Sequence, residues 1–369
     1  MYCAFYLEPL GNGPISKRLR DYNQVDNGRF IDALERELKS IPETEPLTTI
    51  YLGGGTPTEL SQPDFEHLFE IIHRTVNTDA VREWTIEANP GTLTQEKISY
   101  MLNAGVTRTS LGVQSFDPDT LEFMGRLHDA NEALDSFYKL REAGCQNISV
   151  DLMLALPGRN EEALQKDIDR LVELDPEHAS AYILELDHDA PLQTLADKGL
   201  FTEVKDEEAA RQYHQLRTEL TNAGFQHYEI SNFAKPGFES RHNQHYWAAG
   251  EYYGCGPSAS GHLDGERYKN VPNLQKYCHY LEQNESPVCE HDQVTDKQKA
   301  GETLMLALRT RRGIDDATFQ KKTGFSYFDL RGQEIAALIN EGLLEFESSH
   351  LRLTDRALVV SDTVFAELI

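Results

Sequence analysis

The stretch Tyr51-Leu52-Gly53-Gly54-Gly55-Thr56-Pro57-Thr58 joins the end of an apolar run, residues 47–52, to a glycine turn. Glycine lets backbone amide groups approach a bound group because no side chain stands in the way. A tight turn between a strand and a helix uses glycine too, and an isolated triple glycine is more often such a turn. The stretch therefore predicts a strand followed by a turn, and the rest of the chain decides whether that turn also holds a ligand.

Helical and strand-like patterns alternate from residue 25 to about residue 225. Between short apolar runs, apolar residues recur three or four positions apart, as on one face of a helix. This alternation is typical of parallel βα units. The predicted strands are residues 47–52, 83–88, 107–113, 147–154 and 178–186.

Polar and glycine residues stand where these predicted strands end, which is where parallel βα barrels gather their chemistry. Glu87 could accept hydrogen bonds from an ammonium group, Asp151 from ribose hydroxyls, and Arg126 could clamp a carboxylate. Each alone could be a surface charge or a helix cap. Together they favour one shared ligand with an amino acid end and a nucleoside end.

Composition limits the partners of the chain. Asp and Glu outnumber Lys and Arg by 61 to 35, and the resulting net charge of −26 would repel nucleic acid and anionic lipid. The five cysteines are scattered without pair spacing, which indicates a reducing compartment. No apolar run approaches the ~20 residues of a membrane span, and no leader is visible, so we predict a cytoplasmic protein.

Three segments are predicted along the chain. Residues 1–225 carry the βα pattern, and residues 226–291 form an aromatic, glycine-rich connecting region. Residues 292–369 carry three helical patterns, two short strands and a closing helix, an order that resembles a winged helix. In an acidic chain we interpret this last segment as a packing domain rather than a DNA reader.

Four motifs together resemble the oxygen-independent coproporphyrinogen oxidase family of radical S-adenosylmethionine (SAM) proteins. They are Gly53 to Thr58, Glu87-Ala88-Asn89-Pro90-Gly91, Leu111-Gly112-Val113-Gln114-Ser115-Phe116 and Asp151-Leu152-Met153-Leu154-Ala155-Leu156-Pro157-Gly158. The resemblance implies a partial (β/α)6 barrel with a C-terminal domain, and SAM bound against a [4Fe-4S] cluster. It also implies a SAM site made by Gly54, Gly55, Thr56, Glu87, Gln114, Arg126 and Asp151.

The opening Met1-Tyr2-Cys3-Ala4-Phe5-Tyr6 resembles the end of the family's Cys-x3-Cys-x2-Cys cluster motif, with Cys3 as the third ligand. Cluster iron needs thiolate ligands, and Met1 would stand between the second and third of them. The first barrel strand would also precede Met1. We therefore expect either a start upstream of Met1 or a family member that has lost its cluster.

Two branches of this family differ at positions that the chain contains. The oxidase has a further cysteine two residues after the third ligand, where this chain has Phe5. The haem chaperone branch, HemW, has His-Asn-x-x-Tyr-Trp, and residues 242–247 match this hexad. Histidine can ligate haem iron and flat rings can lie on a porphyrin, although a histidine beside aromatic residues is more often structural.

The resemblance thus implies a haem chaperone that binds haem and delivers it to acceptor proteins. The haem-binding residues would be His242, Asn243, Tyr246 and Trp247. The alternatives are an oxygen-independent coproporphyrinogen III oxidase, which decarboxylates its substrate by radical chemistry, and a family member without a cluster. The hexad is expected to lie outside the strand-end set that binds SAM.

Overall fold

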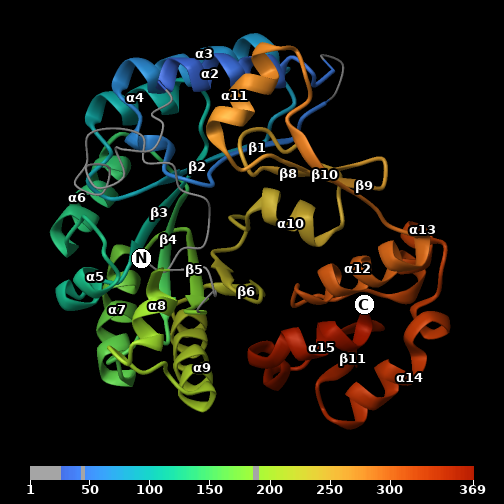
Figure 1. Ribbon diagram of the computed structural model, residues 1–369. Coiled ribbons are helices and arrows are strands. Elements are labelled where there is room, and N and C mark those ends of the chain that lie inside the picture. Colours follow the sequence, from blue (N-terminus) through green and yellow to red (C-terminus); the bar gives the residue numbers. More distant parts are fainter. Residues whose placement is uncertain (1–25, 43–45, 186–190) are drawn as a thin grey trace.

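The structure is a computed structural model that describes residues 26–42, 46–185 and 191–369. Its main feature is a curled seven-stranded sheet in the order β1-β2-β3-β4-β5-β7-β6 (Figure 1). Strands β1 to β5 run parallel, whereas β7 is antiparallel to β5 and β6 is antiparallel to β7. The bounds are Thr49–Leu52, Glu83–Ala88, Arg108–Gln114, Ile148–Leu154, His178–Ile183, Gln226–Glu229 and Asn232–Ala234 for β1 to β7. The predicted α/β partial barrel is confirmed.

The five predicted strands are the five parallel strands of this sheet. The sheet then continues past residue 225 through β6 and β7, which the sequence analysis did not identify as strands. These two strands are only four and three residues long, too short for an alternating pattern to stand out. Residues 186–190, at the predicted end of the fifth strand, lie outside the described residues.

Helices cover the convex face of the sheet (Figure 1). In α3, the Ser61 side chain accepts a hydrogen bond from the Asp64 backbone, a cap worth about 1 kcal/mol. The same helix buries Phe65 and Phe69 completely against the core, because apolar side chains three or four positions apart share one face. Helices α2 to α9 span Asn27–Leu38, Gln62–Thr75, Gln95–Asn103, Pro118–Phe123, Ala130–Glu142, Glu161–Leu174, Pro191–Asp197 and Asp206–Asn222.

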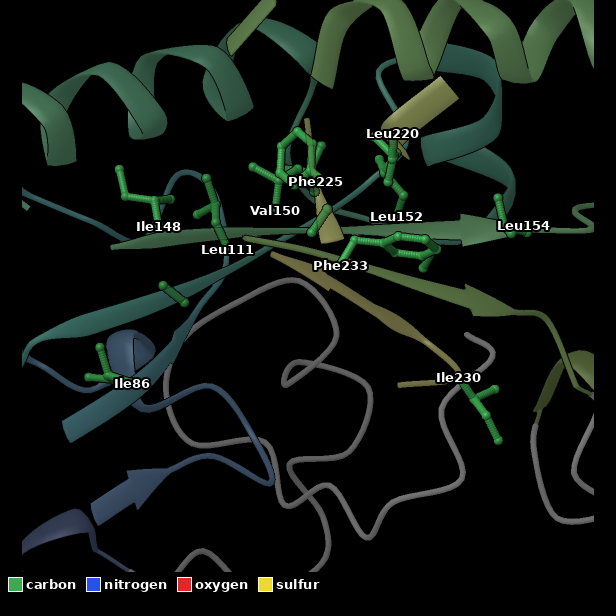
Figure 2. Close-up of a cluster of buried hydrophobic side chains, with 14 of the residues drawn as sticks. Ile86, Leu111, Ile148, Val150, Leu152, Leu154, Leu220, Phe225, Ile230 and Phe233 are labelled. Atoms are coloured by element: carbon green, nitrogen blue, oxygen red, sulfur yellow. The ribbon is translucent and has the colours of Figure 1, made fainter. Parts of the chain in front are cut away.

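Alternation along the strands separates the core from the candidate site. In β4, Ile148, Val150 and Leu152 are buried among core side chains, as Figure 2 shows. Ser149 and Asp151 must point to the opposite, concave face, because successive side chains of a strand alternate between faces. The concave face therefore carries polar side chains while the convex face packs against helices.

A second sheet, in the order β10-β9-β8, follows a short helix, α10. Buried Glu37 of α2 ties this region to the barrel, since its carboxylate accepts hydrogen bonds from Gly256 N (2.7 Å), Asn270 Nδ2 (2.5 Å) and the Tyr277 hydroxyl (2.5 Å). Burial raises the pKa of this carboxyl group, although all three donors oppose that shift. The elements α10, β8, β9, α11 and β10 span Arg241–Trp247, Ser260–Leu263, Glu266–Asn270, Leu274–Glu282 and Val288–Gln293.

The C-terminal segment has the predicted order of three helices, two strands and a closing helix. It is joined to the sheet directly, because Thr310 forms a β-bridge with Glu229 of β6. No helix in the described part of the chain is long and apolar enough to cross a membrane. Helices α12 to α14 span Asp296–Leu308, Asp316–Thr323 and Tyr327–Asn340, β11 and β12 span Leu344–Glu347 and His350–Leu353, and α15 spans Ser361–Leu368.

Candidate functional site

The glycine turn after β1 opens one side of the backbone to a ligand. A Cβ on Gly53 would come within 2.6 Å of the Tyr51 ring and 2.7 Å of the Glu87 carboxyl carbon, so a larger residue here would displace one of these side chains. Gly54 has φ +90°, and a Cβ on it or on Gly55 would meet no heavy atom within 4 Å. Both predicted SAM residues thus have free space beside them, and at Gly54 the backbone conformation also suits glycine.

Glu87, at the end of β2, lies directly beside this turn. Its Oε1 accepts a hydrogen bond from the Tyr51 hydroxyl at 2.7 Å, and its Oε2 accepts one from Gly54 N at 3.2 Å. Burial raises the pKa of the Glu87 carboxyl group, and the charge of Asp151 adds to the rise. Within the described part of the chain Glu87 has no cationic partner at ion-pair distance, so an ammonium group would relieve its burial.

Thr56 and Arg126, both predicted SAM residues, are joined through Asn89. Asn89 donates from Nδ2 to the Thr56 hydroxyl at 2.7 Å and accepts at Oδ1 from the Arg126 guanidinium at 2.7 Å. Arg126 also donates to the Gly112 carbonyl at 2.5 Å. Asn89 belongs to one of the four motifs but had no predicted role. Its side-chain amide holds the Thr56 hydroxyl and the Arg126 guanidinium next to each other.

Asp151 is the carboxylate of the concave face on β4. It accepts hydrogen bonds from the hydroxyls of Ser110, at 3.0 and 3.1 Å, and of Ser149, at 3.1 Å. Burial raises the pKa of this carboxyl group as well. Arg108 and Glu87 both influence this region electrostatically, so the concave face holds two carboxylates and one guanidinium close together.

Gln114 ends β3 with φ +70°, a conformation that is rare for a residue other than glycine. The turn that follows is held by buried Asp167, which accepts from the Ser115 hydroxyl at 2.7 Å and from Phe116 N at 2.9 Å. Arg159 pairs with the same carboxylate at 2.6 Å. The sequence did not reveal this support because Ser115 and Phe116 lie more than 50 residues before Asp167 in the chain.

His128, two residues after Arg126, offers a pH test of this region. It is buried, its Nε2 lies 3.1 Å from the Val113 carbonyl, and burial together with Arg126 lowers its pKa from 6.5 to about 4. The unfolded chain therefore takes up a proton between pH 6.5 and 4 that the folded protein does not, so stability falls as the pH falls through this window.

We expect the free energy of unfolding of the wild type to drop by about 2 kcal/mol more than that of His128→Gln between pH 7 and pH 5. Glutamine keeps a side-chain N–H donor but does not titrate. Urea denaturation at both pH values measures the difference. An identical pH dependence in the two proteins would contradict the assignment of a neutral His128.

The hexad forms helix α10, whose start is held by the barrel. Ser240 caps it by accepting from Asn243 N at 3.2 Å. Buried Glu83, at the start of β2, accepts from Arg241 N at 2.9 Å and from His242 N at 3.0 Å. A carboxylate at a helix start satisfies free N–H groups and complements the helix dipole, so the hexad is anchored to the sheet.

Both ring nitrogens of His242 have protein partners. Nδ1 lies 2.8 Å from the Thr49 hydroxyl and Nε2 lies 2.8 Å from the Tyr246 hydroxyl. The ring also stacks on Tyr51, with centroids 5.0 Å apart and planes inclined by 27°. Burial lowers the pKa of His242 to about 4, so the ring is neutral at pH 7. We expected the hexad to lie apart from the predicted SAM residues. The two groups are not fully separate, because Tyr51 contacts both His242 and Glu87.

The other hexad side chains are partly exposed. Tyr246 packs edge-on against Tyr252 with centroids 4.5 Å apart, and the Arg309 guanidinium lies 4.5 Å from the Trp247 ring centre. Trp247 Nε1 is buried, and none of the described residues forms a hydrogen bond with it. Asn243, Tyr246 and Trp247 all retain intermediate exposure, so α10 presents polar and aromatic groups between the barrel and the C-terminal segment.

The chemistry of these residues fits the implied SAM. The site has carboxylates at Glu87 and Asp151, a guanidinium at Arg126 and an open backbone at Gly54 and Gly55. These groups suit the ammonium, hydroxyl and carboxylate functions of SAM. Cys3, the predicted cluster ligand, lies outside the described residues. In the part of the chain that is described, no group of three His, Cys, Asp or Glu side chains could hold a metal ion.

Comparison with known families agrees with this chemistry. The model of the radical SAM superfamily matches residues 1–171, and that of the HemN C-terminal domain matches residues 294–360. The solved structure of Escherichia coli HemN, described as a coproporphyrinogen III oxidase and radical SAM enzyme, superposes with a TM-score of 0.82 at 19% identity. It covers 100% of this chain and 86% of that one, which shows a shared fold.

Curated relatives are more similar in sequence. "Heme chaperone HemW" of Lactococcus lactis is 36% identical over 341 residues, 92% of this chain and 89% of the relative. The protein of the same name from Bacillus subtilis is 35% identical over 340 residues, 91% and 90% of the two chains. The fold and its polar strand ends thus define a radical SAM protein built like HemN. Within that class, the chain belongs to the HemW family.

Proposed function

We propose that this protein is a haem chaperone that binds haem at the hexad of α10 and delivers it to acceptor proteins in the cytoplasm. The observation that carries the proposal is the hexad itself, which stands complete at residues 242–247 and is partly exposed on a helix anchored by Glu83. Relatives named heme chaperone, similar over nine-tenths of the chain, support it. The acidic surface suits protein or small-molecule partners better than nucleic acid.

We also propose that SAM binds at the strand ends. Its ammonium would meet Glu87, its carboxylate Arg126, and its ribose Asp151, with Gly54, Gly55 and Thr56 lining the amino acid end and Gln114 completing the site. Cys3 would serve as one ligand of a [4Fe-4S] cluster, which supplies an electron to SAM in this superfamily. The chain's own part is to bind and orient SAM on the concave face.

At the hexad, Tyr246 and Trp247 provide aromatic faces for the porphyrin. Tyr246 is held in place because its hydroxyl lies 2.8 Å from His242 Nε2. For His242 to ligate haem iron, this nitrogen would exchange the Tyr246 hydroxyl for the metal. Asn243, on the same helix, keeps a side-chain amide that can donate to a propionate.

The competing function, decarboxylation of coproporphyrinogen III, shares the SAM site and the HemN-like fold. One pair of assays on the wild type separates the two. We expect haem to bind in about one equivalent per chain, measured by its Soret band, and coproporphyrinogen to remain unchanged in an anaerobic assay with SAM and a reductant. Conversion of coproporphyrinogen over many turnovers, or no haem binding, would contradict the chaperone proposal.

A further inference from the structure

Tyr51 stands between the two proposed sites and was assigned to neither by the sequence. It lies in β1, two residues after Thr49, so these two side chains share one face of the strand. Its hydroxyl donates to Glu87 Oε1 at 2.7 Å while its ring stacks on His242 at 5.0 Å. The Tyr51 side chain therefore contacts Glu87, a proposed SAM-binding residue, through its hydroxyl, and His242, the first residue of the hexad, through the face of its ring.

The hydroxyl of Tyr51 is a permanent donor, because burial and the charge of Glu87 raise the pKa of the phenol well above its ordinary value. The Glu87 carboxylate is thus held at both oxygens, by Tyr51 on one side and Gly54 N on the other. Such fixed bonds keep the carboxylate aimed at one position, which reduces the entropy lost when a ligand binds.

The same bond helps Glu87 to stay ionised. Burial raises the pKa of Glu87, as does Asp151, whereas hydrogen bonds from Tyr51 and Gly54 N and the charge of Arg108 lower it. An ammonium group binds the ionised carboxylate, so every donor to Glu87 extends binding to lower pH. Removing the Tyr51 hydroxyl takes away the nearest of these donors.

The ring of Tyr51 acts on the other site. His242 is placed by Thr49, by Tyr246 and by its stacking on Tyr51, and the position of Tyr246 depends in turn on His242. Loss of the Tyr51 ring would free the His242 imidazole on one face and loosen the Tyr246 hydroxyl bond.

We propose that Tyr51 is a positioning residue shared by both sites: its hydroxyl aims Glu87 at the ammonium of SAM, and its ring places His242 and Tyr246 for haem. The inference rests on the proposed function and adds a residue that joins its two halves. It predicts that substitutions of Tyr51 can separate the effect of the hydroxyl on SAM binding from the effect of the ring on haem binding.

Two variants make that separation. Tyr51→Phe keeps the ring, and we expect it to weaken SAM binding about tenfold while haem affinity changes by less than about twofold. Tyr51→Leu removes the ring as well, and we expect it to weaken haem binding about fivefold in addition to the loss at SAM. Isothermal titration with SAM and Soret titration with haem, on anaerobically prepared full-length protein, measure the two affinities.

The pH dependence of SAM affinity distinguishes this role from a general loss of stability, which would not shift it. In Tyr51→Phe the acidic limb of SAM binding should shift to higher pH, because Glu87 protonates more readily without its donor. Tyr100→Phe is the matched control: its hydroxyl lies 3.4 Å from the Glu66 carbonyl, away from both sites, and its removal should change neither affinity nor the pH limb.

Unchanged SAM affinity and an unshifted limb in Tyr51→Phe would overturn the role of the hydroxyl. Unchanged haem affinity in Tyr51→Leu would overturn the role of the ring. If the wild type itself failed to bind haem or SAM, the proposed function would fail first and the Tyr51 inference with it. Melting temperatures of all variants show whether a loss reflects unfolding instead. If Tyr51→Leu does not fold, Tyr51→Met, which also lacks the ring but has a longer and more flexible side chain to fill its place, decides the role of the ring by the same haem titration.

Discussion

Replacing Glu87 with glutamine is expected to weaken SAM binding about 100-fold, roughly 3 kcal/mol, while leaving haem binding intact. Glutamine is nearly isosteric and can still accept the Tyr51 hydroxyl bond through its amide oxygen. It loses the negative charge, however, and turns an NH2 group toward the Gly54 amide that now donates to Oε2. An incoming ammonium would meet donors where it needs an acceptor.

Calorimetric titration of SAM into wild type and Glu87→Gln measures this loss. Glu59→Gln is the matched control, because Glu59 lies in the chain just after the glycine turn, interacts with Arg126 through its charge, and has no place in the proposed ligand set. If Glu87→Gln bound SAM as tightly as Glu59→Gln, SAM would not use the strand-end carboxylate.

The second large effect is expected at the hexad. The double substitution Tyr246→Ala and Trp247→Ala removes two aromatic faces, each worth about 1.5–3 kcal/mol when covered by a ligand, so haem affinity should fall about 100-fold or more. SAM binding should remain, because Glu87, Arg126 and Asp151 keep their own partners. The Arg309 contact with Trp247 is also lost, and a melting curve shows what that costs the fold.

Much of this fold could be predicted from local pattern. The parallel strands are apolar runs between helices with a clear helical period, and both signals lie within a dozen residues of sequence. Glu87, near the end of β2, was predicted for the same reason, because the carboxyl ends of parallel strands meet at one edge of a sheet. Asp151 was also predicted at a strand end, but it lies in the middle of β4 and reaches the site because its side chain points to the concave face. Strands β6 and β7 were missed because their pairing with β5 and with each other, rather than any pattern of their own, defines them.

The contacts that tie the sites together could not be predicted. His242 contacts Thr49, 193 residues away in the sequence, and Arg241 contacts Glu83, 158 residues away. Asp167 supports the turn after Gln114 from more than 50 residues away. Such contacts follow from how elements pack in three dimensions. No motif or spacing in the sequence indicates that Tyr51 contacts both His242 and Glu87.

The central claim, that α10 is a haem-binding element, is tested most directly by Soret titration of haem against three proteins: the wild type, the Tyr246→Ala, Trp247→Ala double variant, and a Phe328→Ala, Phe346→Ala double variant. Phe328 and Phe346 are a stacked and exposed aromatic pair outside the hexad, with centroids 6.0 Å apart, so they report adventitious binding of haem to surface rings. We expect weak haem binding only in the Tyr246→Ala, Trp247→Ala variant. Equal haem affinity in all three folded proteins would contradict the claim.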